Sequence, residues 1–118
     1  MIISLVKIFP RHEKRQEAQD ILLAVKGPTL AAAGCLSVSC YEEHDDEESI
    51  LYVELWQSLS ELERHVRSSS YAKVLAAIEL SACQPEITFS ETGKTWGFEL
   101  VERLRGNVMP RCPDKLQA

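Results

Sequence analysis

Two hydrophobic patterns divide the chain into predicted strands and helices. Apolar side chains at every second position over about 4–8 residues indicate a strand, and apolar positions spaced i, i+3, i+4 and i+7 indicate an amphipathic helix. These patterns predict strands over residues 2–9, 35–43, 50–57, 85–90 and 95–104. They predict helices over residues 12–26, from Leu59 onward, and again after the serines at 68–70.

The ends of these helices carry sequence signals. Gly27 and Pro28 should end the first helix, because proline lacks an amide hydrogen and glycine is a poor helix former. A short helical turn follows, which Gly34 closes. Ser58 and Glu61 have the spacing of a capping box, in which both side chains accept hydrogen bonds from free backbone amides. A helix should therefore start directly after the strand over residues 50–57.

That strand has the most regular alternation in the chain. One of its faces carries Tyr52, Glu54 and Trp56, and the other carries Leu51, Val53 and Leu55. A tyrosine, a carboxylate and an indole on one face can line a partly polar pocket for a planar ligand.

The predicted order is strand, helix, two strands, helix, strand, with an extra C-terminal strand. This order, with the middle strands as a hairpin, is that of a ferredoxin-like α+β fold with an antiparallel sheet. The helices cover only one face of such a sheet. We therefore expect a homodimer in which the open faces of two sheets pack together.

Composition narrows the range of partners. A net charge of −5 over 118 residues, with no long Lys/Arg cluster, argues against nucleic acid. No apolar run approaches the roughly 18 residues of a membrane-spanning helix, and no cleavage signal follows the first strand. The sequence predicts a cytoplasmic protein with one domain over residues 1–104 and a polar tail over 105–118. Its cysteines should then be reduced; Cys35 and Cys40 have opposite parity and should lie on opposite faces of their strand.

No metal, flavin or nicotinamide is expected. The chain has no glycine-rich loop with phosphate-binding spacing, no C-x-x-C pair and only scattered histidines. The acidic run at 42–49 lacks the glycine and ligand spacing of a calcium loop. We interpret it as a solvated hairpin loop.

The candidate chemistry centres on Trp56 and His65. A tryptophan at a strand end is more often a core residue, and a lone helical histidine is more often structural. The alternative is a site in which His65 is a base, oriented by Glu61 one helical turn earlier. Trp56 Nε1–H or the Tyr52 hydroxyl would then stabilise an oxyanion.

The stretch YVELWQSLSELERHVRSSSYAKVL resembles the antibiotic biosynthesis monooxygenase-like (ABM) family. The positions that carry this resemblance are Glu54, Trp56, Ser58, His65 and Tyr71, and the Gly34-Cys35 pair at the start of the second strand. The resemblance implies a dimeric α+β barrel, with members that oxidise aromatic molecules using dioxygen and no cofactor, or that degrade haem.

The resemblance also implies a set of site residues. We expect catalytic roles for His65, Trp56 and Tyr52, and substrate contacts from Glu54 and Tyr71. Haem-degrading members rely on an asparagine near the end of the first strand, where this chain has none, so no haem is expected. The sequence therefore predicts a cofactor-independent monooxygenase-like protein acting on a small aromatic or carbonyl-containing molecule. A non-catalytic homodimer that binds a small ligand, or an accessory protein, is the alternative.

Overall fold

The computed structural model describes residues 1–44 and 49–106. In chain order the elements are β1 (Ile2–Ile8), a 3-10 helix (His12–Lys14), α1 (Arg15–Leu30), β2 (Cys35–Glu42), β3 (Ile50–Trp56), α2 (Leu59–Val66), α3 (Ser69–Ile78), β4 (Glu86–Glu91) and α4 (Phe98–Arg105). The first four predicted strands appear within about one residue of their expected ends, which is the usual uncertainty of strand boundaries.

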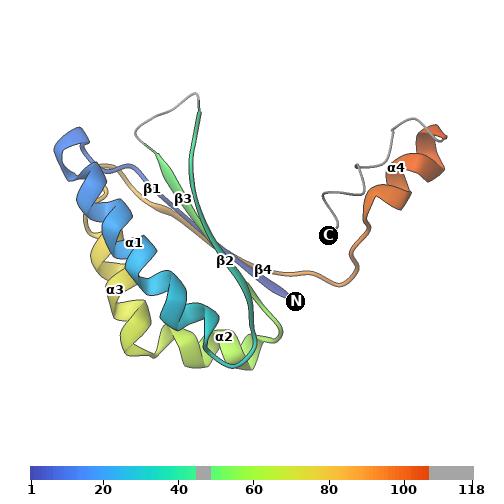
Figure 1. Cartoon of the computed structure of the whole chain (residues 1–118), viewed down its shortest axis with the longest axis horizontal. Helices are drawn as coiled ribbons and strands as arrows, with labels where there is room; N and C mark the ends of the chain where they lie inside the picture. The colour runs from blue at the N-terminus through green and yellow to red at the C-terminus, as the bar shows by residue number, and fades with distance from the viewer. Residues whose placement is uncertain (45–48, 107–118) are drawn as a thin grey trace, which may run out of the picture.

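The strands form one antiparallel sheet with the order β2-β3-β1-β4. β2 and β3 make the predicted hairpin. α1 connects β1 to β2, while α2 and α3 connect β3 to β4, and all three helices lie on the same face of the sheet (Figure 1). The predicted ferredoxin-like α+β fold is confirmed.

Strand alternation decides which side chains enter the core. β1 and β3 bury every second residue, beginning with Ile2 and Ile50, on the face that the helices cover. The helices contribute Ala18, Leu22, Val25, Tyr71, Val74 and Ala77 to the same layer. Glu54 and His65 are buried there too, so the core contains a carboxylate and an imidazole.

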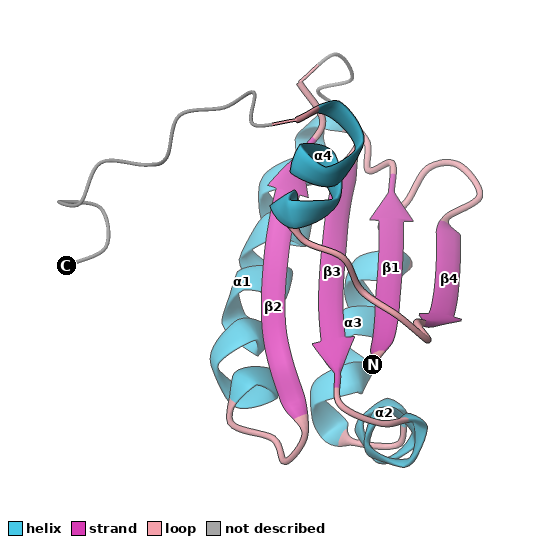
Figure 2. Ribbon diagram, turned by 90° about the vertical axis from the view of Figure 1, so that its right-hand side faces the viewer, coloured by secondary structure: helices cyan, strands magenta, loops and turns pink. Residues whose placement is uncertain are grey.

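The opposite face of the sheet is built from the alternate residues of β1 and β3. Leu5, Leu51, Val53 and Leu55 belong to it, and each is only half-buried. Figure 2 looks onto this face, with α1 and α3 behind the sheet and α2 beyond its lower end. These three helices therefore leave an apolar surface uncovered.

The predicted strand over residues 95–104 is wrong, because this segment contains helix α4. The apolar alternation there is short, whereas Phe98, Val101 and Leu104 repeat at intervals of three, a helical spacing. Gly97, in an extended conformation, is the N-cap. Over residues 1–44 and 49–106 the fold is thus a ferredoxin-like sheet with no further strand after β4.

Helix α1 continues through Gly27 and Pro28, so the predicted stop is also wrong. The φ of proline is compatible with a helix, although one backbone hydrogen bond is lost. Proline normally clashes with the Cβ of the preceding residue, and Gly27 has none. Thr29, which is fully buried, holds the last turn against the core.

Cys35 and Cys40, predicted on opposite faces of β2, both pack against the helix-side core. The register of β2 against β3 shifts between Cys35 and Ser37. Such a bulge adds one residue to a strand and breaks the alternation of its faces. Both thiols are free.

None of the helices in the described part of the chain is long and apolar enough to cross a bilayer. Residues 1–44 and 49–106 contain no group of three side chains able to hold a metal ion. Within the acidic run, positions 45–48 lie outside the described residues, as does the predicted tail from position 107 onward.

Candidate functional site

The turn from β3 into α2 brings Trp56 and His65 together. β3 ends at Trp56, and α2 begins at Leu59 after Ser58, an N-cap in an extended conformation. So short a connection folds α2 back against the end of the sheet. The ring centroids of Trp56 and His65 lie 4.7 Å apart, with the ring planes tilted by 32°.

Glu54 holds both rings in place. Its side chain is 0% exposed. Its Oε1 accepts a hydrogen bond from Trp56 Nε1 at 2.9 Å, and its Oε2 lies 3.0 Å from His65 Nε2. The sequence suggested that Glu61 orients the imidazole; in the structure the carboxylate that does so is Glu54, from the adjacent strand.

This buried carboxylate affects the acidity of its neighbours. Burial raises the pKa of the Tyr52 hydroxyl far above its usual range, and the negative charge of Glu54 raises it further. The pKa values of the Cys35 thiol and the Tyr71 hydroxyl are raised by the same two causes, in the same order. These three groups therefore stay protonated around Glu54 at neutral pH.

Tyr52 and Tyr71 lie behind the pair of rings, toward the core. The buried hydroxyls of Tyr52 and Thr29 have no hydrogen-bond partner of ordinary geometry among the described residues, although Thr29 acts to lower the pKa of Tyr52. The Tyr71 ring meets the His65 ring edge-on, with centroids 5.4 Å apart. Ser68 fixes Tyr71 by accepting a hydrogen bond from its backbone amide at 3.3 Å.

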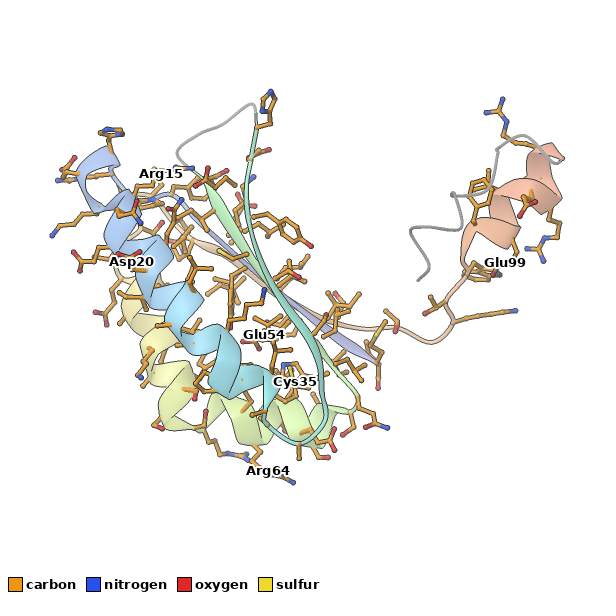
Figure 3. The ribbon with its side chains drawn as sticks, viewed as in Figure 1. Arg15, Asp20, Cys35, Glu54, Arg64 and Glu99 are labelled. Atoms are coloured by element: carbon orange, nitrogen blue, oxygen red, sulfur yellow. The ribbon has the colours of Figure 1, made fainter. Side chains whose placement is uncertain are left out.

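A cleft of about 130 Å³ opens on the outer side of Trp56 and His65. It lies between the end of α1, helix α2 and the start of α3. Its walls also include Pro28, Ala32, Glu61, Arg64 and Ser68. Figure 3 shows Glu54 in the layer between sheet and helices and Arg64 at the outer edge of α2. The cleft therefore lies between Arg64 and the ring of His65, and His65 separates it from Glu54.

Gly34 fits closely against the Glu61 side chain in one wall of this cleft. Its φ is +84°, and a Cβ there would lie 1.7 Å from Glu61 Oε2. Glu61 does not complete the predicted capping box, because the Ser58 side chain accepts no amide hydrogen bond. Ser58 Oγ instead lies 3.1 Å from Ser60 Oγ.

The five site residues proposed from the sequence therefore fall into two groups. Trp56 and His65 line the cleft, whereas Tyr52, Glu54 and Tyr71 lie behind them and do not. Their roles in binding or catalysis stay predictions.

Sequence reasoning missed the other cleft walls, for identifiable reasons. Pro28 and Ala32 reach the cleft because α1 extends beyond its predicted end. Arg64 directly precedes His65, but the sequence pattern indicates only an ordinary exposed position on a helix. Only the placement of α2 against the end of α1 reveals its position at the rim.

The model of the antibiotic biosynthesis monooxygenase family matches residues 1–77, well over half of the chain. No match emerged among curated proteins.

Solved structures share the fold. Rv0793 from Mycobacterium tuberculosis is 25% identical, with a TM-score of 0.73, covering 81% of this chain and 98% of its own. A conserved protein from Methanosarcina mazei is 24% identical, with a TM-score of 0.72 and coverages of 78% and 92%. A Deinococcus radiodurans protein, provisionally named an antibiotic biosynthesis monooxygenase, is 21% identical, with a TM-score of 0.74 and coverages of 82% and 97%. On the strength of the family match, this chain belongs to the antibiotic biosynthesis monooxygenase family.

Proposed function

We propose that this protein is a cofactor-independent monooxygenase whose substrate is a small aromatic or carbonyl-containing molecule held in the cleft beside Trp56 and His65. The observation that carries the proposal is the buried Glu54–His65 pair at the inner end of that cleft. Family membership supports monooxygenase-like chemistry. The pair supplies what such chemistry needs from a protein, namely an oriented base.

His65 is the proposed base. Its Nε2 faces Glu54 at 3.0 Å, so Nδ1 is the ring nitrogen left to meet a ligand. In the tautomer with the hydrogen on Nε2, Nδ1 takes a proton from a phenol or from a carbon next to a carbonyl. Glu54, as a positioning residue, stabilises the imidazolium that results.

The substrate anion then reacts with dioxygen directly. Proton removal makes the substrate electron-rich, so it can reduce dioxygen without a flavin or a metal. The substrate supplies all four electrons and the two hydrogens of the water, so a phenol leaves as a quinone, or a CH₂ beside a carbonyl leaves as a second carbonyl. One oxygen atom enters that product, and the other leaves as water. The protein has to hold the anion and keep bulk water away from it.

A residue at the rim of the cleft is the proposed group that stabilises the substrate anion. The sequence suggested Trp56 Nε1–H or the Tyr52 hydroxyl as donors, but the first is bonded to Glu54 and the second does not line the cleft. Arg64 is a cation in the lining. We assign it the substrate oxyanion. Trp56 is fully buried with His65 packed against its ring, so its role is to support the imidazole and close the inner end of the cleft with an apolar ring.

The size of the cleft restricts the substrate. Its volume of about 130 Å³ is well below the roughly 300–1,000 Å³ of pockets for drug-sized ligands. A molecule with a single ring, such as a dihydroxybenzene, matches this volume better than a polycyclic one.

A homodimer is part of the proposal. The uncovered face of the sheet carries half-buried Leu5, Val53 and Leu55. A second copy packing sheet against sheet would bury these side chains.

One observation favours a second function, the non-catalytic binding of a small ligand by the same dimer. Both oxygens of Glu54 are already engaged by Trp56 and His65. A fully satisfied buried network of this kind also serves to specify and rigidify a core, with no chemistry attached.

Oxygen uptake with a panel of single-ring hydroxyaromatics and 1,3-dicarbonyl compounds tests the proposal. We expect wild-type protein to consume oxygen with at least one class, without added cofactor. His65→Gln keeps a donor near the position of Nε2 for Glu54 but removes the second ring nitrogen. We expect it to lower turnover at least about 100-fold while leaving the melting temperature nearly unchanged.

His12→Gln is the matched control, because His12 is exposed and lies in the 3-10 helix. It should leave turnover unchanged. If His65→Gln turns over at the wild-type rate, His65 is not the base. If the panel binds without oxygen uptake, and Arg64→Gln abolishes that binding, the second function holds and the first is rejected.

A further inference from the structure

We propose that α4 of one chain docks on a second copy of this chain, in an apolar groove between α2 and β4. This interaction goes beyond the proposed reaction, and it rests on the sheet-to-sheet homodimer proposed with it. The segment after β4, residues 92–106, would then be an arm that packs on the partner.

Helix α4 has an apolar stripe that no other described residue of the chain covers. Phe98, Val101 and Leu104 lie along one side of the helix and are 47%, 38% and 73% exposed. Glu99 and Arg103 lie on the other side. None of the residues in α4 is buried, and none belongs to either core cluster. An amphipathic helix this short is marginal in water without a surface to pack on.

The position of α4 points away from its own core. Figure 1 shows α1, α2 and α3 on one side of the sheet and α4 on the other. Figure 2 shows the segment after β4 crossing in front of the open face, from the end of the sheet near α2 toward the opposite end. A second sheet packed on that face would come to lie beside the arm.

The groove that fits α4 lies at the other end of the molecule. It has a volume of about 310 Å³ and is lined by Leu59, Leu62, Glu63, Val66, Arg67 and Phe89. Its apolar residues are unusually exposed for their type, with Leu59 at 52% and Phe89 at 47%. An exposed apolar patch rimmed by charges is typical of an interaction surface.

The charges of the two surfaces are compatible. The groove carries one anion, Glu63, and one cation, Arg67. α4 also carries both signs, with Glu102 beside its apolar stripe and Arg105 at the C-terminal end of the stripe. An antiparallel seating places Glu102 near Arg67 and Arg105 near Glu63, whereas a parallel seating brings like charges together, so the charges favour the antiparallel orientation.

Geometry selects the partner's groove over the chain's own. Within one chain, α4 and α2 lie at opposite ends of the sheet (Figure 2), and the groove is lined mainly by α2. A twofold axis between two facing sheets, running across the strands, exchanges these ends. The partner's α2 then lies next to α4, and the contact is made twice, which closes the dimer without leaving a free arm.

Photo-crosslinking of the full chain tests this contact. Leu104, which is highly exposed, is replaced by p-benzoylphenylalanine, and chains labelled with light and heavy nitrogen are mixed before irradiation. We expect mixed-isotope covalent dimers, with cross-links that map to the partner's α2 and β4. The same photoreactive residue at Arg103, on the polar side of α4, should give several-fold fewer.

Sedimentation gives an independent measurement. Leu104→Glu and Val66→Glu should each weaken dimerisation at least about tenfold, the effect of removing one buried aliphatic contact. Arg103→Ala, which changes the net charge by the same one unit as Leu104→Glu, should have no effect.

The outcomes separate this inference from the proposed dimer. Cross-links within one chain, or a wild-type dimer that Leu104→Glu leaves unchanged, would overturn the arm and leave the sheet-to-sheet contact standing. A wild-type protein that sediments as a monomer at micromolar concentration would overturn both. Oxygen uptake by single-ring substrates is measured separately and does not depend on α4.

Discussion

At the scale of single residues, the feature with the largest consequences is the placement of a carboxylate in an apolar layer. Glu54 is tolerated there because Trp56 and His65 occupy its two oxygens. A buried group with all its hydrogen bonds made is stable, and the same group with one bond missing is costly. Substitutions at this position therefore report directly on the network.

Glu54→Gln keeps the shape of the side chain but has only one acceptor oxygen. It can serve Trp56 or His65, and it presents an NH₂ group to the other. We expect a loss of about 1–3 kcal/mol in the free energy of unfolding, measured by urea titration. Glu79→Gln, at an exposed position at the end of α3, should change it by less than about 0.5 kcal/mol. Equal stability of the two variants would mean that the network is not formed.

The tyrosines near Glu54 predict a pH dependence. Burial, and then the charge of Glu54, raise the pKa values of Tyr52 and Tyr71 in the folded state. Above about pH 10 the unfolded chain loses protons that the folded chain keeps, so stability falls as pH rises. The expected slope is up to about 1.4 kcal/mol per pH unit for each tyrosine.

Denaturation midpoints between neutral pH and pH 11 measure this slope. Tyr52→Phe and Tyr71→Phe should each flatten the alkaline decline, because each removes one group that titrates only on unfolding. A decline that both variants leave unchanged would have to come from other groups.

At the scale of elements, the connection between α1 and β2 depends on Gly34. Its φ of +84° and its contact with Glu61 exclude a side chain for two separate reasons. We expect Gly34→Ala to lower the free energy of unfolding by at least about 1 kcal/mol. Glu61→Ala in the same protein should recover the steric part of this loss but not the backbone part.

Gly93→Ala is the control, because a Cβ at Gly93 meets no atom within 4 Å and the φ there is not positive. Thermal unfolding of the three variants separates the two costs. If Gly34→Ala is as stable as Gly93→Ala, the connection is more adaptable than its geometry indicates.

Elements that are determined by residues close in sequence were predicted correctly. Those that depend on contacts between distant segments were not. The alternation in β3 reflects one buried face, so it gave the position of that strand, and the β-branched and aromatic residues of β1 indicated the other. The end of α1 depends on Thr29 being anchored in the core, which overrides the local effect of Pro28. The bulge beside Cys35 changes the face of β2 on which Cys35 lies relative to Cys40. This bulge arises from the pairing of β2 with β3, so the sequence of β2 alone does not reveal it.

The same reasoning explains the candidate site. Glu54 was identified, but its partner was not, because sequence spacing favours contacts within a helix. Glu61 is one turn from His65, while Glu54 reaches it only once α2 has folded over the sheet. The cleft itself is formed by three helices, and no local pattern encodes its walls.

At the scale of the whole molecule, the uncovered face of the sheet predicts association. At micromolar concentration we expect a sedimenting mass of about twice 13.3 kDa. Val53→Lys places a charge on the open face and should give a folded monomer. Leu23→Lys, at an exposed position on α1, is the matched control and should remain dimeric. A wild-type monomer would rule out the barrel arrangement.

The proline within α1 has a consequence for access to the cleft. Because Pro28 donates no hydrogen bond, the carbonyl of Ala24 lacks its helical partner, and the last turn is tied to the rest of the helix by fewer bonds. Pro28 and Ala32 are also cleft walls. Amide hydrogens after Pro28, such as that of Ala31, should therefore exchange with solvent faster than those near Leu22. The last turn of α1 would therefore open locally at a lower free energy than the rest of the helical layer. Because this turn forms a wall of the cleft, its opening would give a ligand access to the site.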